Sequence, residues 1–217
     1  MAKRTAGDFE IATWYDTWNL TGWNNLEGKI VPLNLATRYN LAFGHLSEVE
    51  SGGYSVDMSG QWCSQVKEQI TAQAPGVVIY AGLGDGGIIQ TVKDNHLFQN
   101  RSTVNIVKWL LANGYGGISI DAEEEGMIAV AELVTQLGAH FKSASLGIAV
   151  SVPWPRQGPV SLYGERAVQA FNDHVDAVEL QDYSSGFEPT DPPSLSTDAQ
   201  VWVSAGVRSS ILMGGVC

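Results

Sequence analysis

Short, nearly continuous apolar runs alternate with amphipathic stretches along the whole of this 217-residue sequence. The runs are rich in Val and Ile, which is typical of β-strands that are covered on both faces. Seven of them are predicted strands: Phe9–Trp18, Arg38–Phe43, Val77–Gly82, Gly117–Glu123, Leu146–Val152, Ala177–Tyr183 and Ser210–Gly215. The stretches between them have apolar residues at helical spacing, and five are predicted helices: Ser64–Ala74, Thr103–Asn113, Met127–Ala144, Tyr163–His174 and Thr197–Ala205. This alternation indicates a parallel sheet with helical crossovers.

Seven strand–helix units favour a TIM-type (β/α) barrel over a doubly wound open sheet, and we predict one such domain over residues 1–217. The eighth strand of such a barrel is not evident. Either the chain is part of a longer one, or the first strand, Phe9–Trp18, pairs directly with the last, Ser210–Gly215. Direct closure would leave a shallower cleft, with Trp14 or Trp154 as its floor.

The charge balance excludes several classes of partner. Acidic residues outnumber basic ones by 23 to 12, the net charge is −11, and no basic run offsets it. Nucleic acid and anionic membrane surfaces would therefore be repelled. No apolar run approaches the roughly 20 residues that span a bilayer. The start, Met1–Asp8, has basic residues but no apolar stretch behind them, so we expect no signal peptide in this chain.

The most informative segment reads Gly114-Tyr-Gly-Gly-Ile-Ser-Ile-Asp-Ala-Glu-Glu-Glu-Gly126. In a strand, Ser119, Asp121 and Glu123 share one face, and the intervening apolar residues share the other. A buried carboxylate is costly unless it is partnered or functional, so acids at the carboxyl end of a barrel strand indicate catalysis. The alternative is a strand that runs into an exposed acidic helix start, where the following glutamates suit the helix dipole.

The segment from Phe98 to Glu123 resembles glycoside hydrolase family 18, the chitinases and endo-β-N-acetylglucosaminidases. The signature of that family is Asp-Gly-x-Asp-x-Asp-x-Glu, preceded by a helix with an Arg near its start. On this pattern Glu123 corresponds to the general acid, and Asp121 to the Asp that holds the acetamido group of the substrate. Gly116 replaces the first Asp, and Ser119 replaces the second, which pairs in the family with the residue matching Asp121. A serine can form a hydrogen bond there, but it cannot share a proton.

Four further strand segments resemble the family: Trp14-Tyr15, Asn40–Phe43, Ala81–Gly84 and Glu179–Tyr183. The last resembles the sixth strand, whose Tyr contacts the acetamido carbonyl, a role that would fall to Tyr183. The resemblance thus implies three catalytic residues: Glu123, Asp121 and Tyr183. The substrate-binding candidates are Trp14, Tyr15, Ser119, Trp154 and Gln181.

The resemblance implies hydrolysis of β-1,4 linkages next to N-acetylglucosamine, in chitin-type oligomers or N-glycan cores. In such enzymes the 2-acetamido oxygen of the substrate is the nucleophile, and the configuration is retained. An oligosaccharide or glycan is then the expected partner, and secretion is implied. The alternative is a catalytically silent, lectin-like barrel, which the changes at Gly116 and Ser119 favour.

No cofactor or metal is predicted. Gly82–Gly87 has the form G-x-G-x-x-G, but no acid lies between Asp94 and Asp121 to bind a ribose. The helix that should follow such a loop is predicted only from Thr103, so a glycine-rich loop above a substrate cleft is the simpler interpretation. The histidines are scattered, and the two cysteines lack metal-ligand spacing.

Overall fold

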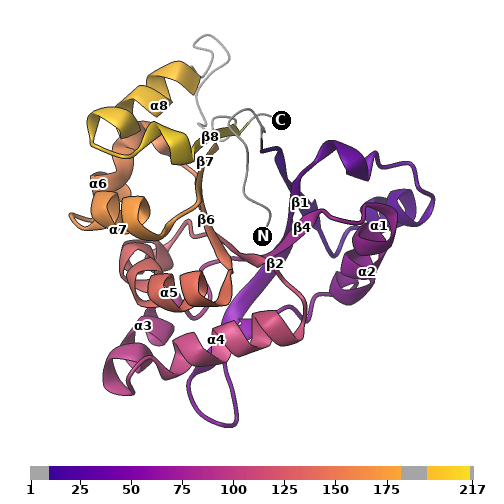
Figure 1. The fold of residues 1–217 in the computed structure, drawn as a ribbon, viewed down its shortest axis with the longest axis horizontal. Helices are drawn as coiled ribbons and strands as arrows, with labels where there is room; N and C mark the ends of the chain where they lie inside the picture. Colours follow the sequence, from indigo (N-terminus) through magenta and orange to yellow (C-terminus); the bar gives the residue numbers. More distant parts are fainter. Residues whose placement is uncertain (1–9, 182–194, 216–217) are drawn as a thin grey trace.

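The computed structural model of the chain describes residues 10–181 and 195–215. Within these ranges seven parallel strands form a curled sheet in the order β1, β2, β4, β5, β6, β7, β8, and β3 pairs antiparallel with β2. The strands are β1 Ala12–Asp16, β2 Arg38–Glu48, β3 Tyr54–Asp57, β4 Val78–Leu83, β5 Gly117–Asp121, β6 Gly147–Val152, β7 Ala177–Gln181 and β8 Leu212–Gly215. Figure 1 shows a half-barrel with helices around its outer side. The predicted TIM-type class is confirmed, as a curled half-barrel.

The α-helices of the described ranges are α1 Leu20–Glu27, α2 Cys63–Gln73, α3 Ile88–Leu97, α4 Arg101–Ala112, α5 Val130–Ala144, α6 Gly158–Tyr163, α7 Ala167–His174 and α8 Leu195–Ser204. Short 3₁₀ helices are η1 Leu33–Leu35, η2 Glu125–Ala129, η3 Pro155–Gln157 and η4 Ser209–Ile211. Each of the five predicted helices overlaps one of these α-helices or more. The predicted helix Tyr163–His174 is divided at Gly164, whose φ of 85° ends α6.

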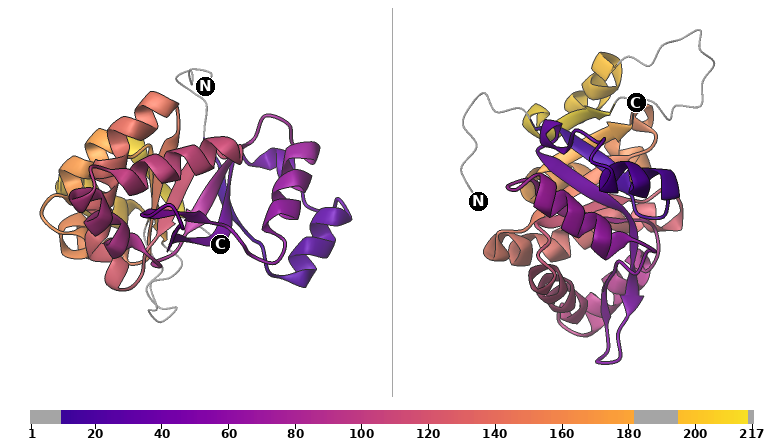
Figure 2. Two further views of the ribbon diagram at one scale, coloured as in Figure 1. Left: turned by 90° about the horizontal axis from the view of Figure 1, so that it is seen from below. Right: turned by 90° about the vertical axis from the view of Figure 1, so that its right-hand side faces the viewer.

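Three elements were not predicted: α1, α3 and β3. The side-chain oxygen of Asn19 accepts hydrogen bonds from the first turn of α1, which is an N-cap that a short polar helix needs. Strand β2 continues past the sheet and turns back as β3, so that the β2–β3 hairpin projects from the lower end of the molecule (Figure 2). Ser102 of α4 holds this hairpin by accepting a hydrogen bond from the Tyr54 backbone N–H at 2.8 Å.

The two faces of the curled sheet are packed differently. Aliphatic side chains on the outer face, such as Ile118, Ile120 and Val150, are buried against the helices in the main apolar core. The inner face has only a small apolar cluster of Tyr80, Ala149 and Ala177, with Val78 and Met213 against it. Much of the rest of the inner face is polar. Successive side chains of a strand point to opposite faces, so the outer face can form the apolar core with the helices while the inner face carries polar side chains.

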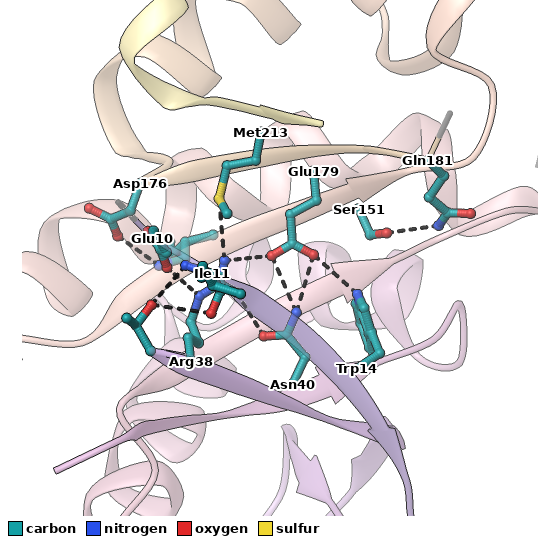
Figure 3. Close-up of polar contacts among 12 residues, drawn as sticks. Glu10, Ile11, Trp14, Arg38, Asn40, Ser151, Asp176, Glu179, Gln181 and Met213 are labelled. Atoms are coloured by element: carbon teal, nitrogen blue, oxygen red, sulfur yellow. Dashed lines mark hydrogen bonds and ion pairs between the residues drawn. The ribbon is translucent and has the colours of Figure 1, made fainter. Parts of the chain in front are cut away.

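A buried carboxylate spans this polar interior (Figure 3). Glu179 of β7, which is 8% exposed, lies 2.6 Å from Arg38 Nη2 of β2. The carboxylate also accepts hydrogen bonds from Asn40 Nδ2 at 3.1 Å and from Trp14 Nε1 of β1 at 3.1 Å. Arg38 is paired a second time, with Glu10 at 2.6 Å. One side chain therefore joins β7 to the first two strands of the sheet.

Of the two predicted alternatives, direct closure of the barrel by the first and last strands is wrong. Within the described residues no backbone ladder joins β1 to β8, so these strands stay at the two ends of the sheet order. Seven strands at ordinary tilt do not complete the circumference that eight close. The gap is instead spanned by side chains, through Glu179 and through Arg38 Nη2, which lies 3.8 Å from Met213 Sδ of β8.

Glu179→Ala should destabilise the fold strongly, because it leaves the Arg38 guanidinium buried beside a single remaining carboxylate. Removing one partner of a buried pair costs about 3–5 kcal/mol. Urea unfolding followed by circular dichroism measures this, with Glu68→Ala on the exposed side of α2 as the control. A loss below about 1 kcal/mol, the size of an ordinary substitution, would contradict the role of this network.

Candidate functional site

A pocket of about 270 Å³ opens at the carboxyl ends of the strands. Four strands and the loops after them contribute its lining: Trp14, Asp16, Trp18, Ala42, Phe43, Asp121 and Gln181. This is the end of a (β/α) barrel where active sites are built, because the loops after the strands converge there. Two acids, an amide and three aromatic rings therefore face one small space.

Asp121 is the last residue of β5, and it lies partly buried in this pocket. Gln181 Nε2 of β7 donates to Asp121 Oδ1 at 2.7 Å and to Ser151 Oγ of β6 at 2.7 Å. Burial and then the charge of nearby Glu123 raise the pKa of Asp121 to about 6, although the hydrogen bonds from Ser151 and Gln181 oppose this. A carboxyl group held in this way can change its protonation near neutral pH.

Glu123 lies beyond the end of β5, not within the strand as predicted. The ladder between β5 and β6 stops at Asp121, and the chain then turns toward η2. The Glu123 side chain is exposed, and its backbone N–H donates to Asp85 Oδ2 at 2.9 Å. Glu123 is still close enough to Asp121 for its charge to raise the pKa of Asp121.

Aromatic rings form one side of the pocket. The rings of Trp18 and Phe43 are stacked, with centroids 6.0 Å apart, and the Trp14 ring lies 5.3 Å from Phe43. Trp18 is 53% exposed and Phe43 is 42% exposed. These large apolar side chains are open to solvent beside the two acids of the pocket. Their flat faces are surfaces on which a ring-shaped ligand could stack.

Ser119 points into the half-barrel below Asp121, as predicted from the alternation. It is fully buried, and its Oγ has no hydrogen-bond partner among the described residues. An unpaired buried hydroxyl is unfavourable by roughly 1–3 kcal/mol. The hydrogen bond that a serine could have given to the pocket acids is therefore not formed.

The other predicted site residues have different placements. Tyr15 neighbours Trp14 in β1, so it faces the opposite way; its hydroxyl donates to the Gly22 carbonyl of α1 at 2.6 Å, and it packs on the outer core. Trp154 follows β6 and is 38% exposed, but it does not line the pocket. Tyr183 lies outside the described residues, so its predicted role is untested.

Several pocket residues were not predicted from the sequence. Asp16 and Trp18 lie two and four positions after Trp14, so strand periodicity could have placed all three on one face. Phe43 is the last residue of a predicted strand, and this place at the carboxyl end of the strand could have indicated that it lines the pocket. Asp85, which does not line the pocket but contacts the Glu123 backbone, was assigned only to a glycine-rich loop, because nothing in the local sequence reveals that contact.

The glycine-rich loop differs from the expectation. Helix α3 begins at Ile88, directly after the loop, although no helix was predicted between the loop and Thr103. The loop is packed against β2: a Cβ on Gly87 would lie 1.8 Å from the Leu46 carbonyl oxygen. Within the described residues no three His, Cys, Asp or Glu side chains form a group that could hold a metal ion.

Comparison of the sequence with protein-family models and with curated proteins finds no match. Solved structures do match. The catalytic domain 2 of a Group II chitinase from Ostrinia furnacalis, in complex with (NAG)5, has a TM-score of 0.71 at 18% identity, over 96% of this chain and 63% of that one. A glycoside hydrolase family 18 chitinase from Cycas revoluta, in complex with (GlcNAc)3, has a TM-score of 0.70 at 17% identity, over 94% and 67%. A chitinase from Chromobacterium violaceum has a TM-score of 0.70 at 14% identity, over 95% and 68%.

The chain thus has the fold of the family 18 chitinases, as the sequence resemblance implied, and its structural neighbours are chitinases. It spans 63% of the length of the Ostrinia chain. No helix of the described ranges is both long and apolar enough to cross a membrane.

The raised pKa of Asp121 predicts a pH dependence of stability. The folded protein binds this proton more tightly than the unfolded chain, from an unfolded value of 3.8 to about 6. The stability that Asp121 contributes is complete below the unfolded value and is lost as the pH rises to about 6. Relative to the Asp121→Asn variant, the wild type should therefore lose roughly 2–3 kcal/mol of unfolding free energy between about pH 4 and 6.

Urea unfolding at a series of pH values measures this difference. Asp173→Asn, on the exposed side of α7, is the matched control. The difference between its free energy of unfolding and that of the wild type should not change with pH. A flat difference for Asp121→Asn as well would show that the pocket does not raise the pKa of Asp121.

Proposed function

We propose that this chain is a glycosidase domain that cleaves β-1,4 linkages next to N-acetylglucosamine, in chitin-type oligomers or N-glycan cores. The observation that supports the proposal is that Asp121, held by a hydrogen bond from Gln181, lines a pocket together with three aromatic rings, and that burial raises its pKa to about 6. Glu123 follows two residues later, as in the family signature. The chitinase neighbours, some in complex with N-acetylglucosamine oligomers, support the same substrate class.

In the proposed mechanism the substrate supplies its own nucleophile. The 2-acetamido oxygen attacks the anomeric carbon while Glu123 protonates the departing glycosidic oxygen. Ionised Asp121 accepts the acetamido N–H and stabilises the positive charge that develops on the oxazolinium ring. Gln181 fixes the Asp121 carboxylate by donating to Oδ1, and Ser151 adds a further hydrogen bond. Water then opens the ring, with Glu123 acting as the base.

The aromatic side of the pocket has a separate role in this proposal. The exposed faces of Trp18 and Phe43 would stack on sugar rings, and the Trp14 ring would lie beneath the residue next to the cleaved bond. Such contacts bind substrate and transition state alike, so they should affect KM more than kcat. Tyr183 remains the proposed contact to the acetamido carbonyl.

A lectin-like protein is the second candidate, and one observation favours it. Ser119 replaces the carboxylate that would pair with Asp121, and its hydroxyl makes no hydrogen bond within the described residues. A binding protein needs the aromatic pocket but has no use for an acid at position 123. Binding of chitin oligomers by a wild-type protein that does not cleave them would establish this alternative.

Glu123→Gln should lower turnover of chitin oligomers or of an N-glycan by about 10²–10⁴-fold, the contribution of one general acid. Binding should change little, because the amide keeps the size and the hydrogen-bonding reach of the acid. Product release measured by chromatography, with isothermal titration for binding, tests both points. The matched control is Glu124→Gln, the exposed neighbour. Wild-type activity in Glu123→Gln would exclude Glu123 as the acid.

Substrates without the 2-acetamido group should not be cleaved, because they lack the nucleophile. Chitin oligomers and cellulose oligomers of equal length offer the comparison, and Asp121→Asn should lose activity on the former. A thiazoline that mimics the oxazoline intermediate should inhibit competitively. Equal turnover of both oligomer types would rule out the substrate-assisted mechanism while leaving a glycosidase in place.

A further inference from the structure

Asp85 lies in the loop between β4 and α3, and its carboxylate contacts the segment that follows β5. Oδ2 accepts a hydrogen bond from the Glu123 backbone N–H at 2.9 Å. Oδ1 accepts two more, from the backbone N–H groups of Glu124 at 3.1 Å and Gly126 at 3.2 Å. Three amides of one turn are therefore bound by a single ionisable side chain from a different strand connection.

The segment that carries Glu123 lies between two buried residues of the main apolar core, Ala122 and Met127. The β5 ladders end at Ile120 toward β4 and at Asp121 toward β6. The glutamate side chains at positions 123 and 124 are exposed, so packing does not hold them. Hydrogen bonds to a charged acceptor are about twice as strong as those between neutral groups. Between those two residues, Asp85 supplies the side-chain hydrogen bonds that hold the backbone of the turn.

Asp85 itself is held in place through backbone contacts to β2. The Gly84 N–H donates to the Gly44 carbonyl at 3.1 Å, and the Leu46 N–H donates to the Gly86 carbonyl at 2.9 Å. No side chain would fit at Gly87, where a Cβ would collide with the Leu46 carbonyl oxygen. These backbone contacts to β2 therefore fix the loop that carries the Asp85 carboxylate.

On the other side of this contact, the turn after β5 also comes very close to Asp85. A Cβ on Gly126 would lie 2.7 Å from Asp85 Oδ1 and 3.1 Å from the Asp85 carbonyl oxygen. The absence of a side chain at position 126 is what lets the turn approach the carboxylate. Both sides of this contact are therefore shaped for it.

We propose that Asp85 is a positioning residue for catalysis: by binding the amides of Glu123, Glu124 and Gly126, it sets where the Glu123 carboxyl group stands relative to Asp121. The proposal rests on the proposed glycosidase function. Misplacement of a catalytic group by about 1 Å can cost about 10²-fold in rate. A residue that acts in this way should affect kcat and leave the affinity of the aromatic pocket for sugar nearly unchanged.

Two substitutions at position 85 separate the contacts. Asp85→Ala removes all three hydrogen bonds and should lower kcat by about 10–100-fold, with KM within about 3-fold of the wild type. Asp85→Asn can keep its oxygen on the Glu124 and Gly126 amides, but its NH₂ group then faces the Glu123 N–H, donor against donor. We expect an intermediate kcat, with the local loss confined to Glu123.

Asp176→Ala is the matched control. The Asp176 carboxylate also accepts a backbone hydrogen bond, from Ile148 N–H at 2.9 Å, but at the amino ends of the strands, away from the pocket. This variant should lose stability and keep its kcat. A general loss of stability at position 85 would resemble this control, with kcat unchanged.

Amide hydrogen exchange measured by NMR gives a readout that does not depend on turnover. In Asp85→Ala the amides of Glu123, Glu124 and Gly126 should exchange at least about 10-fold faster, while amides within β5 keep their protection. If Asp85→Ala does not fold, Asp85→Asn and Gly126→Ala, which pushes the turn off the carboxylate, carry the test.

The outcomes separate the two proposals. Faster exchange at these amides together with a selective fall in kcat supports positioning. Faster exchange with unchanged kcat overturns positioning and leaves the glycosidase proposal standing. Unchanged exchange shows that Asp85 does not hold the turn and overturns the inference directly. An inactive wild type overturns the glycosidase proposal, and the catalytic role of Asp85 with it.

Discussion

A sheet of seven parallel strands leaves a gap where an eighth would lie, and the buried Glu179 carboxylate reaches across the interior of this half-barrel. It binds Arg38, Asn40 and Trp14, so that β7 is attached to β1 and β2 without a backbone ladder. Burial of a charge is expensive, and the pair with Arg38 is stable only because further hydrogen bonds satisfy both groups. The curvature of the sheet, and with it the convergence of the strand ends on one pocket, depends on this contact.

The two candidate acids, Asp121 and Glu123, are held in different ways. Asp121 belongs to the sheet, and it is held in a fixed hydrogen-bonded position by Ser151 of the adjacent strand β6 and Gln181 of β7, two strands away. Glu123 belongs to a turn, and it depends on a carboxylate from another loop. A rigid group suits the role of orienting a substrate.

The sequence predicts the strands well because each is a short apolar run, and the inward face of β5 follows from simple alternation. Residues beyond a strand end are less predictable, since Glu123 leaves the strand geometry as soon as the ladder stops at Asp121. The contacts of Asp85 and Glu179 join positions 38 and 139 residues apart, and no local pattern encodes them. Helix α3 was missed because its buried face includes Thr91 and Asn95, which hydropathy alone counts as solvent-exposed.

Trp14 belongs both to the buried ion-pair network and to the pocket. Its indole N–H binds Glu179, and its ring lines the space in front of Asp121. A ligand that contacts the Trp14 ring would therefore also affect the hydrogen bond between Trp14 and Glu179, which joins β1 to β7. By thermodynamic linkage, occupancy of the pocket and resistance to opening of the half-barrel are coupled, so a bound ligand would raise the melting temperature in proportion to the logarithm of its concentration. The seven tryptophans of the chain make this coupling accessible to fluorescence.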